Sequence, residues 1–475
     1  MDGGNRLRAF RFRRVSPTFD LMKPRLPLQS GLRAVRAAFL LGALGTALWP
    51  AGSALAAPGA APGATPQPQP LPEYRAAEGA RRIEGKPSTA DAPLLETGAV
   101  YEDALAPGER VYRLSLDAAS SVYVSAVLHP PAGTAAGYGD GLEVEVMTTG
   151  GRSCPGNPGR ATFGYDAVPL GAVGQRLLAE DAECQAAGTY YAKVTRSAAG
   201  KDSPRAAWPV ELQVRREPAP AAGTAPTAAP SVWPSASPVL PGTDPVPRGG
   251  GTGFNDARAL GAGVWRDELR PGQTRFYRVP LDWGQQLGVG AEIAKARMTK
   301  EYGSASDGLT VALYSPYRGP VDSKDTSYDG KQAAVTLPRT APVAYGNRFA
   351  DAAAVRAVRV AGWYYVAVTL GGKVGEFTQD AAAVPLTLRV EVSGGGGRGA
   401  GGAPAYRESL ADAGFGVGEA ERDAAREGLT APEAAAARED HRFAMRVVAG
   451  AGFGAGAVLL LALGGWALLA RRSGR

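Results

Sequence analysis

Histidine and cysteine are scarce in this chain of 475 residues, which has two of each. Protein zinc sites and the catalytic triads of most hydrolases are built largely from these side chains. The chain also lacks the Gly-x-Ser-x-Gly, His-Glu-x-x-His, Walker and dinucleotide-binding motifs. We therefore expect no cofactor and no catalytic residue, and predict that the protein is not an enzyme. A hydrolase with paired carboxylates stays open as an alternative, because such pairs have no fixed spacing in a sequence.

An excess of positive charge is missing from most of the chain, although its formal net charge is +7. Residues 1–56 hold nine of the 52 Lys and Arg residues and two of the 45 Asp and Glu residues, so the rest of the chain balances. Binding to nucleic acid depends on a net positive surface. Without residues 1–56 no such excess remains, and we expect no nucleic-acid partner.

The N-terminal residues 1–56 have the features of a secretory signal peptide. Basic residues precede a short apolar run at 37–49, and Ala-Leu-Ala at 54–56 is a small-x-small cleavage site. An uncleaved anchor is the less favoured alternative, because the run is shorter than the ~20 residues that span a bilayer. Met22 is an alternative start. The Pro- and Ala-rich residues 57–93 predict a disordered tether.

One stretch of the sequence occurs twice. Residues 101–117 and residues 265–282 both contain a Pro-Gly turn, a strand with a Tyr-Arg centre and a Leu-Asp end, with the tyrosines at Tyr112 and Tyr277. Further blocks match downstream in the same order, among them the two Tyr-Gly pairs that begin at Tyr138 and Tyr302. We infer one fold used twice.

The fold class that we predict is mainly β. Short alternating apolar runs with turns between them indicate antiparallel, jelly-roll-like β-sandwiches over residues 94–217 and 252–393. The Pro-rich residues 218–251 between them read as a semi-stiff linker. We therefore expect two tandem sandwiches that pack independently or only loosely.

The two cysteines, Cys154 and Cys184, lie in the loop-rich middle of the first repeat. In an exported protein an isolated pair most simply forms a disulfide. A redox or metal pair is the alternative, but the spacing is not Cys-x-x-Cys and no histidine lies nearby. His129 ends a predicted strand, where we expect a solvated side chain.

Strand parity separates the side chains of residues 361–369 into two sets. Tyr364 and alternate residues after it form the expected core face, whereas Trp363 and Tyr365 lie on the opposite face. These two aromatics are a candidate binding patch. The alternative, which we favour, is that the long insert at residues 320–350 covers Trp363, because large aromatics are usually mostly buried.

The C-terminal part of the chain predicts a membrane anchor. Residues 394–430 form a flexible Gly- and Ala-rich stalk, and a capping box begins a juxtamembrane helix at 431–446. Residues 447–470 carry no charge and predict a transmembrane helix, which makes the fold class two sandwiches plus one spanning helix. The basic tail at 471–475 is then cytoplasmic, so the protein is a single-pass cell-membrane protein with its N-terminal ectodomain outside.

Small residues recur within the expected spanning helix. Two overlapping Gly-x-x-x-Gly patterns are formed by Gly450, Gly452, Gly454 and Gly456. Such patterns allow helices to approach closely, so a homodimer through them is a candidate partnership.

The second repeat carries the motifs of a known family. It begins Phe-Asn-Asp at Phe254, continues Leu-Thr-Val-Ala-Leu-Tyr-Ser-Pro from Leu309, and contains Ala-Gly-Trp-Tyr-Tyr from Ala361. With these motifs, residues 254–392 resemble a bacterial pre-peptidase C-terminal-like domain, and residues 94–216 do so more weakly. The resemblance implies a β-sandwich that serves in binding, targeting or folding. The layout also resembles that of Ala-, Gly- and Arg-rich actinobacterial envelope proteins.

The long insert of the second repeat is acidic. It contains Asp322, Asp325 and Asp329, and some members of the resembled family bind calcium, so these residues are weak calcium candidates. The spacing matches no EF-hand, and a solvated acidic loop is the alternative.

These observations lead to three hypotheses of function. The first is a non-catalytic envelope protein that displays two binding modules for a surface protein or a glycan. The second is an accessory subunit of a membrane or secretion complex, assembled through its anchor helix. The third is an extracellular hydrolase.

Overall fold

The computed structural model describes most of the chain after Pro70. The described residues are 70–155, 159–164, 166–178, 183–230, 232–234, 236, 238–379, 382–395 and 402–472. The expected signal peptide and the first part of the expected tether lie outside them. Residues 66–475 form one compact unit.

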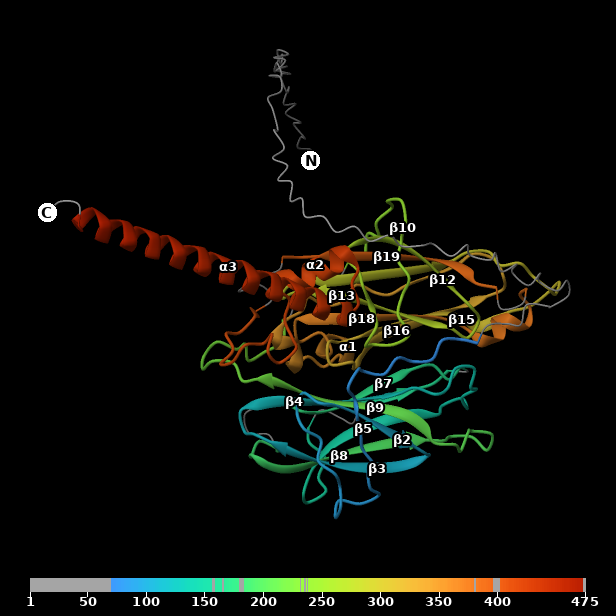
Figure 1. The fold of residues 1–475 in the computed structure, drawn as a ribbon. Coiled ribbons are helices and arrows are strands. Elements are labelled where there is room, and N and C mark those ends of the chain that lie inside the picture. The colour runs from blue at the N-terminus through green and yellow to red at the C-terminus, as the bar shows by residue number, and fades with distance from the viewer. Residues whose placement is uncertain are drawn as a thin grey trace, which may run out of the picture. The chain divides into compact units, whose positions relative to one another are not determined.

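The first repeat is a sandwich of two sheets (Figure 1). One sheet has the strand order β1-β2-β9-β4-β7 and the other β3-β8-β5-β6, and all pairs except the parallel β1–β2 pair are antiparallel. The strands are β1 (Arg81–Arg82), β2 (Val100–Leu105), β3 (Gly108–Leu116), β4 (Ser120–Leu128), β5 (Gly141–Thr148), β6 (Gly159–Thr162), β7 (Leu170–Arg176), β8 (Gly188–Ser197) and β9 (Trp208–Pro218).

The second repeat has the same strand order, with the short strand β11 added beside β13. Its sheets are β10-β12-β19-β14-β17 and β11-β13-β18-β15-β16, so the predicted duplication is confirmed. The elements are β10 (Val246–Pro247), β11 (Arg258–Ala259), β12 (Gly263–Leu269), β13 (Thr274–Leu281), β14 (Gln286–Ile293), β15 (Ala305–Tyr314), β16 (Pro320–Tyr328), β17 (Ala333–Thr336), η1 (Tyr345–Phe349), α1 (Ala353–Arg356), β18 (Gly362–Leu370), η2 (Gly372–Glu376) and β19 (Val384–Ser393).

Alternation along the strands positions the two cores. In β18, Tyr364, Val366 and Val368 are fully buried in the core of the second sandwich, and the equivalent β8 residues are buried in the first. The core face predicted from strand parity is therefore confirmed. The opposite face of the β11-β13-β18-β15-β16 sheet is left to meet the rest of the molecule.

Each repeat is closed by its own N-terminal segment. In the first repeat, Asp103 accepts hydrogen bonds of 2.7 Å from the Tyr112 hydroxyl and from the backbone N–H of Gly85. In the second, Asp267 accepts bonds of 2.6 Å from the Tyr277 hydroxyl and 2.7 Å from the N–H of Gly250. We call this arrangement the Gly–Asp–Tyr clasp.

Glycine is required in both clasps by close packing. A Cβ atom on Gly85 would lie 2.6 Å from a ring carbon of Tyr112, and one on Gly250 would lie 2.8 Å from a ring carbon of Tyr277. Such distances are below van der Waals contact, so no other residue fits without a shift of the tyrosine. The clasp shows that the repeats begin earlier than the sequence patterns predict.

The N-terminal boundary differs from the expected one. Residues 70–93, which we expected to belong to a disordered tether, are ordered and packed against the sandwiches. Arg81 and Arg82 pair with β2, and Ala92 is buried. Short polar and Pro-rich sequence hides this order, because the contacts are made mostly through backbone groups.

The linker at residues 218–251 is also packed. Leu240 lies over Gly290 and Pro238 over Gly288, where glycine leaves the outer face of β14 open to close approach. Gln286 donates to the Pro234 carbonyl at 2.9 Å. The expected spacer is therefore part of the second sandwich.

The expected flexible stalk at 394–430 folds back onto the sandwiches where it is described. Phe415 is buried, and α2 (Glu419–Glu427) is tied to the residue that follows β13 by the ion pair of Arg422 with Asp282 at 2.7 Å. The capping box is confirmed, since the Thr430 N–H donates to Glu433 at 2.8 Å at the start of α3 (Ala431–Arg472).

Within the part of the chain that the structure describes, no helix combines the length and the apolar character that crossing a bilayer needs, so the spanning helix expected over residues 447–470 is not supported.

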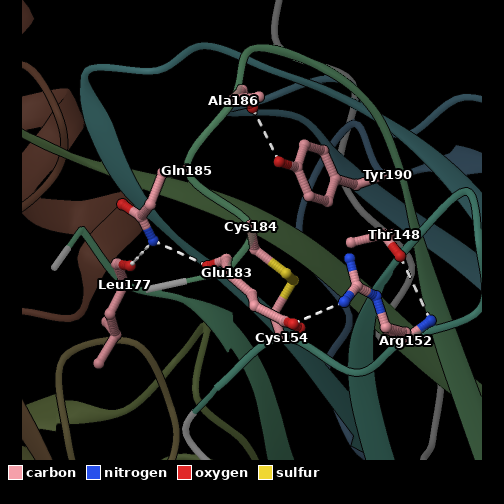
Figure 2. Close-up of a disulfide and its surroundings, with 9 residues drawn as sticks. All are labelled: Thr148, Arg152, Cys154, Leu177, Glu183, Cys184, Gln185, Ala186 and Tyr190. Atoms are coloured by element: carbon pink, nitrogen blue, oxygen red, sulfur yellow. Dashed lines mark hydrogen bonds and ion pairs between the residues drawn. A yellow bond between two sulfur atoms is a disulfide. The ribbon is translucent and has the colours of Figure 1, made fainter. Parts of the chain in front are cut away.

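The predicted disulfide between Cys154 and Cys184 is confirmed, with their Cα atoms 5.7 Å apart (Figure 2). It joins the loop after β5 to the loop before β8. Beside it, Arg152 pairs with Glu183 at 2.6 Å, and the hydroxyl of Tyr190 donates to the Ala186 carbonyl at 2.8 Å. The disulfide therefore fixes the chain on both sides of the edge strand β6.

Candidate binding cleft

The two sandwiches are joined by buried ion pairs. Arg318 of the second repeat pairs with Glu211 of the first, and Arg348 pairs with Glu217 at 2.8 Å. All four side chains are at most 5% exposed. Burial, the largest single effect, lowers the pKa of Arg318, but the charge and hydrogen bond of Glu211 together with Tyr74 and Tyr365 outweigh it, and the pKa is raised. The expectation of loosely packed repeats is therefore wrong. Buried charged side chains join the repeats, and no apolar pattern in the sequence marks that interface.

Aromatic rings fill the same interface. Tyr123 of the first repeat stacks on Tyr317 of the second with ring centroids 4.3 Å apart, and Phe415 of the C-terminal segment lies edge-on to Tyr123 at 6.1 Å. The hydroxyls of Tyr123 and Tyr406 both donate to Glu217, at 2.6 and 2.9 Å. The C-terminal segment therefore closes the junction between the repeats.

The candidate patch of Trp363 and Tyr365 lies at this interface. Tyr365 is buried and meets Phe254 edge-on at 5.1 Å, within a cluster that includes Val127 of the first repeat. Trp363 is half-buried against the same cluster, with the guanidinium of Arg278 4.2 Å above its ring. The other repeat, rather than the 320–350 insert, packs against this face.

A segment before the first sandwich binds both repeats. We call residues 70–77 the N-terminal strap. Its Ala77 N–H donates to Glu211 of the first repeat at 2.8 Å, and its Arg75 N–H donates to the Thr252 hydroxyl of the second at 3.1 Å. Asn255 donates to the Arg75 carbonyl at 3.0 Å.

Beside the interface the repeats leave an open cavity of about 720 Å³, which we call the inter-repeat cleft. One wall comes from β6 and the loop that follows it in the first repeat, and the floor comes from the outward face of β13, β18, β15 and β16. The cleft residues used below are Arg160, Asp166, Thr274, Asp307, Thr310, Asp325, Ala367 and Thr369.

The cleft floor carries a row of hydroxyl and carboxylate side chains. In strand register, Thr274 pairs with Thr369, Thr369 with Thr310, and Thr310 with Asp325. The hydroxyls of Thr274 and Thr369 are 2.8 Å apart and share a hydrogen bond. Because neighbouring strands lie ~4.8 Å apart, the row is about 14 Å long. The face that begins at Trp363 and Tyr365 thus continues through Ala367 and Thr369 into the open cleft.

Carboxylates surround this row. Asp166 from the first repeat accepts a hydrogen bond of 3.0 Å from the Gly372 N–H of the second, and burial, then the charge of Asp307, raise its pKa. Arg160, the arginine that lines the cleft, is paired with Glu143 at 2.5 Å. The cleft therefore offers many hydrogen-bond acceptors at its wall and floor.

The three calcium candidates do not converge. Asp322 and Asp325 lie on β16, an edge strand, where their odd spacing places them on opposite faces. Asp329 is exposed and pairs with Lys331 at 3.0 Å, which lowers its pKa. Among the described residues no group of three or more His, Cys, Asp or Glu side chains is arranged to hold a metal. The segment expected as an acidic loop is thus a strand, and calcium binding remains a prediction.

The four glycines proposed for dimerisation, Gly450 to Gly456, lie within α3. At Gly456 an added Cβ would meet open space. A homodimer through this face remains a prediction.

Comparisons with known proteins give weak similarities of fold. No family model and no curated protein matches the chain. The pre-peptidase C-terminal domain of collagenase from Bacillus anthracis is 16% identical with a TM-score of 0.17, covering 30% of this chain and 99% of that one. The tandem CBM22-1–CBM22-2 domain of Xyn10C from Paenibacillus barcinonensis is 11% identical with a TM-score of 0.18, covering 63% of this chain and 92% of that one. The human CUB1-EGF-CUB2 domain of MASP-1/3 is 7% identical with a TM-score of 0.16, covering 62% and 99%.

The first of these structures is the kind of domain that residues 254–392 resemble in sequence. At these TM-scores the similarities carry no functional information, so the cleft is interpreted from its own residues.

Sequence reasoning missed most of the cleft residues. Asp166 and Asp307 belong to different repeats, and no pattern within one repeat brings them together. The threonine row was visible in part, because Thr369 follows Trp363 and Tyr365 at the spacing of one strand face. The spacing that groups Trp363 with Tyr365 extends to Thr369, whereas Thr274 and Thr310 follow only from the strand register.

Proposed function

We propose that this protein is an exported, non-catalytic binding protein that holds a glycan in the inter-repeat cleft. The observation that carries the proposal is the row of Thr274, Thr369, Thr310 and Asp325 on the cleft floor. Sugar hydroxyls both donate and accept hydrogen bonds, and threonine hydroxyls and carboxylates are complementary to them. The regular strand spacing repeats these groups along one line, as an extended ligand requires.

Export is supported by the disulfide. Disulfides persist in oxidising compartments outside the cytoplasm, and Cys154 and Cys184 are paired. The N-terminal signal-peptide pattern points to the same compartment. We therefore place the cleft outside the cytoplasmic membrane.

The test is a glycan array of bacterial and plant polysaccharide fragments probed with the full-length protein. We expect binding to at least one glycan, weakened about threefold to tenfold per lost hydrogen bond in Thr310→Val and in Asp325→Asn. The matched controls are Thr387→Val, on the outward face of the other sheet, and Asp329→Asn, outside the cleft. An array without any binding, or equal losses in the controls, would reject the proposal.

One observation favours a second candidate, a glycoside hydrolase. Asp166 has a raised pKa and lies near enough to Asp307 to feel its charge, and a carboxyl with raised pKa beside a second carboxylate suits general acid catalysis. Release of reducing ends from any glycan bound on the array, abolished in Asp166→Asn, would establish the hydrolase instead. We expect no release.

A further inference from the structure

His129 lies in the interface between the repeats. The solvated side chain expected from its place at a strand end is therefore wrong. His129 follows β4, its backbone N–H donates to the Pro209 carbonyl at 3.0 Å, and the residue is 8% exposed. The ring stacks on Tyr74 of the N-terminal strap, with centroids 4.4 Å apart and planes 21° from parallel. Within the described part of the chain, its buried Nε2 atom has no hydrogen-bond partner.

The stack holds the strap where both repeats meet. The ring of Tyr74 packs on Gly253, where an added Cβ would lie 2.4 Å from it, and its hydroxyl accepts a hydrogen bond of 3.3 Å from Asn255. Further along the strap, Glu73 accepts a bond of 3.2 Å from the Ala132 N–H, close to His129 in the chain. Removing Tyr74 from His129 therefore detaches the middle of the strap.

Charged groups reach this stack from every element around it. Glu211 on β9 is the acidic group that acts on His129. Arg318, from the turn between β15 and β16, pairs with Glu211 and also acts on Tyr74, as does Asp256. Because Arg318 and Asn255 already bind Glu211, its carboxylate is engaged and does not provide a counter-ion reserved for an imidazolium.

We propose that the His129–Tyr74 stack is an acid-sensitive latch: when His129 takes up a proton, the N-terminal strap is released from the groove between the repeats. The proton goes to the buried Nε2 atom, and the charge is then solvated only if Tyr74 moves away. The latch rests on the strap and interface alone, and does not require the proposed glycan.

The direction of the effect follows from burial. Burial lowers the pKa of His129 from 6.5 to about 4 while the strap is closed, and release restores the ordinary value. The latched state is thus fully stable above about pH 6.5 and loses stability as the pH falls toward 4. By linkage between these two values, the released fraction rises about twentyfold between pH 7 and pH 5.

The experiment is amide hydrogen exchange of the full-length protein at pH 7 and pH 5, corrected for intrinsic rates. The reporters are the N–H groups of Arg75 and Ala77, which bind Thr252 and Glu211 in the closed strap. We expect their protection to fall about twentyfold between pH 7 and pH 5 in the wild type, in step with the released fraction. In His129→Phe, which keeps a stacking ring without a titratable nitrogen, we expect the protection to change little.

The chain provides a matched control, because His441 is its other histidine. His441→Phe is expected to behave as the wild type and leaves His129 as the single imidazole for a titration by nuclear magnetic resonance. If His129→Phe disturbs the strap at pH 7, the titration of His129 in His441→Phe is the measurement that tests the latch. An imidazole that titrates near 6.5 in the closed protein, or strap amides whose protection does not fall between pH 7 and pH 5, would overturn the latch.

Discussion

Arg318 and Glu211 form an ion pair between the two sandwiches, with side chains that are 5% and 0% exposed. Arg318 also donates to Asn255 at 2.7 Å, and Glu211 accepts bonds from Asn255 and from the strap. A buried pair of this kind is not in itself evidence of high stability, but breaking it leaves a charge without a partner. The junction between the repeats therefore depends on both residues together.

Replacing Arg318 by Met is expected to destabilise the protein by about 3–5 kcal/mol, because Glu211 then stays buried and unpaired. The free energy of unfolding, measured with urea, checks this expectation. Arg81→Met breaks an ion pair in which both side chains are more than half exposed and should have little effect. A small loss in Arg318→Met would show that water reaches Glu211.

The two clasps predict equal effects in the two repeats. Tyr112→Phe and Tyr277→Phe each remove one hydrogen bond to a carboxylate, at 2.7 and 2.6 Å. Each change is expected to cost about 1.5–3 kcal/mol in the free energy of unfolding. Tyr302→Phe, at a hydroxyl-bearing side chain that is 82% exposed, is the control and should cost almost nothing. A large effect in one repeat alone would contradict the equivalence of the clasps.

Replacing Asp166 is expected to change thermal stability and glycan binding in opposite directions. Burial raises its pKa, so the charged carboxylate is unfavourable in the folded protein at neutral pH. Asp166→Asn is expected to raise the thermal midpoint at pH 7 and to weaken glycan binding. The gain should vanish below about pH 3.8, where the carboxyl is protonated in both folded and unfolded protein. Asp329→Asn should change neither quantity, and a lower midpoint for Asp166→Asn at pH 7 would count against the burial argument.

The disulfide predicts a loss confined to the first repeat. It closes a loop of 30 residues, for which the entropy of the unfolded chain gives about 3–4 kcal/mol. The double variant Cys154→Ser/Cys184→Ser should lose that amount of unfolding free energy and therefore unfold at a lower urea concentration. Exchange of the amides of β6 should rise first, because the bridge ends the loop that leads into this edge strand. Unchanged protection of β6 would show that the cleft wall does not depend on the bridge.

The sequence predicted what lies within one repeat. The strand faces of Tyr364 and Val366 and the helix start at Thr430 depend on local spacing, and the disulfide depends on a single cysteine pair in an exported chain; each is found in the structure. The duplication was predicted for the same reason, since both copies keep the Tyr-Arg centre and the Pro-Gly turn.

Contacts between distant segments were missed. Arg318 and Glu211 are buried although arginine and glutamate are usually exposed, so no pattern in the sequence marks them as residues of the interface. Gly288 and Gly290 lack side chains and so admit the linker on the outer face of β14, a contact that no pattern in the sequence marks. The disordered tether at residues 57–93 and the flexible stalk at 394–430 are predicted from Pro-, Ala- and Gly-rich composition, which does not show that residues 70–93 and 402–430 pack on the sandwiches.

The Gly–Asp–Tyr clasp also decides where this protein can be divided. A fragment that starts at Thr252 keeps the large strands of the second sandwich but loses β10 and Gly250, so Asp267 would face an empty groove beside its tyrosine. Any attempt to produce that sandwich on its own has to begin upstream of Val246, within sequence that looks like dispensable spacer.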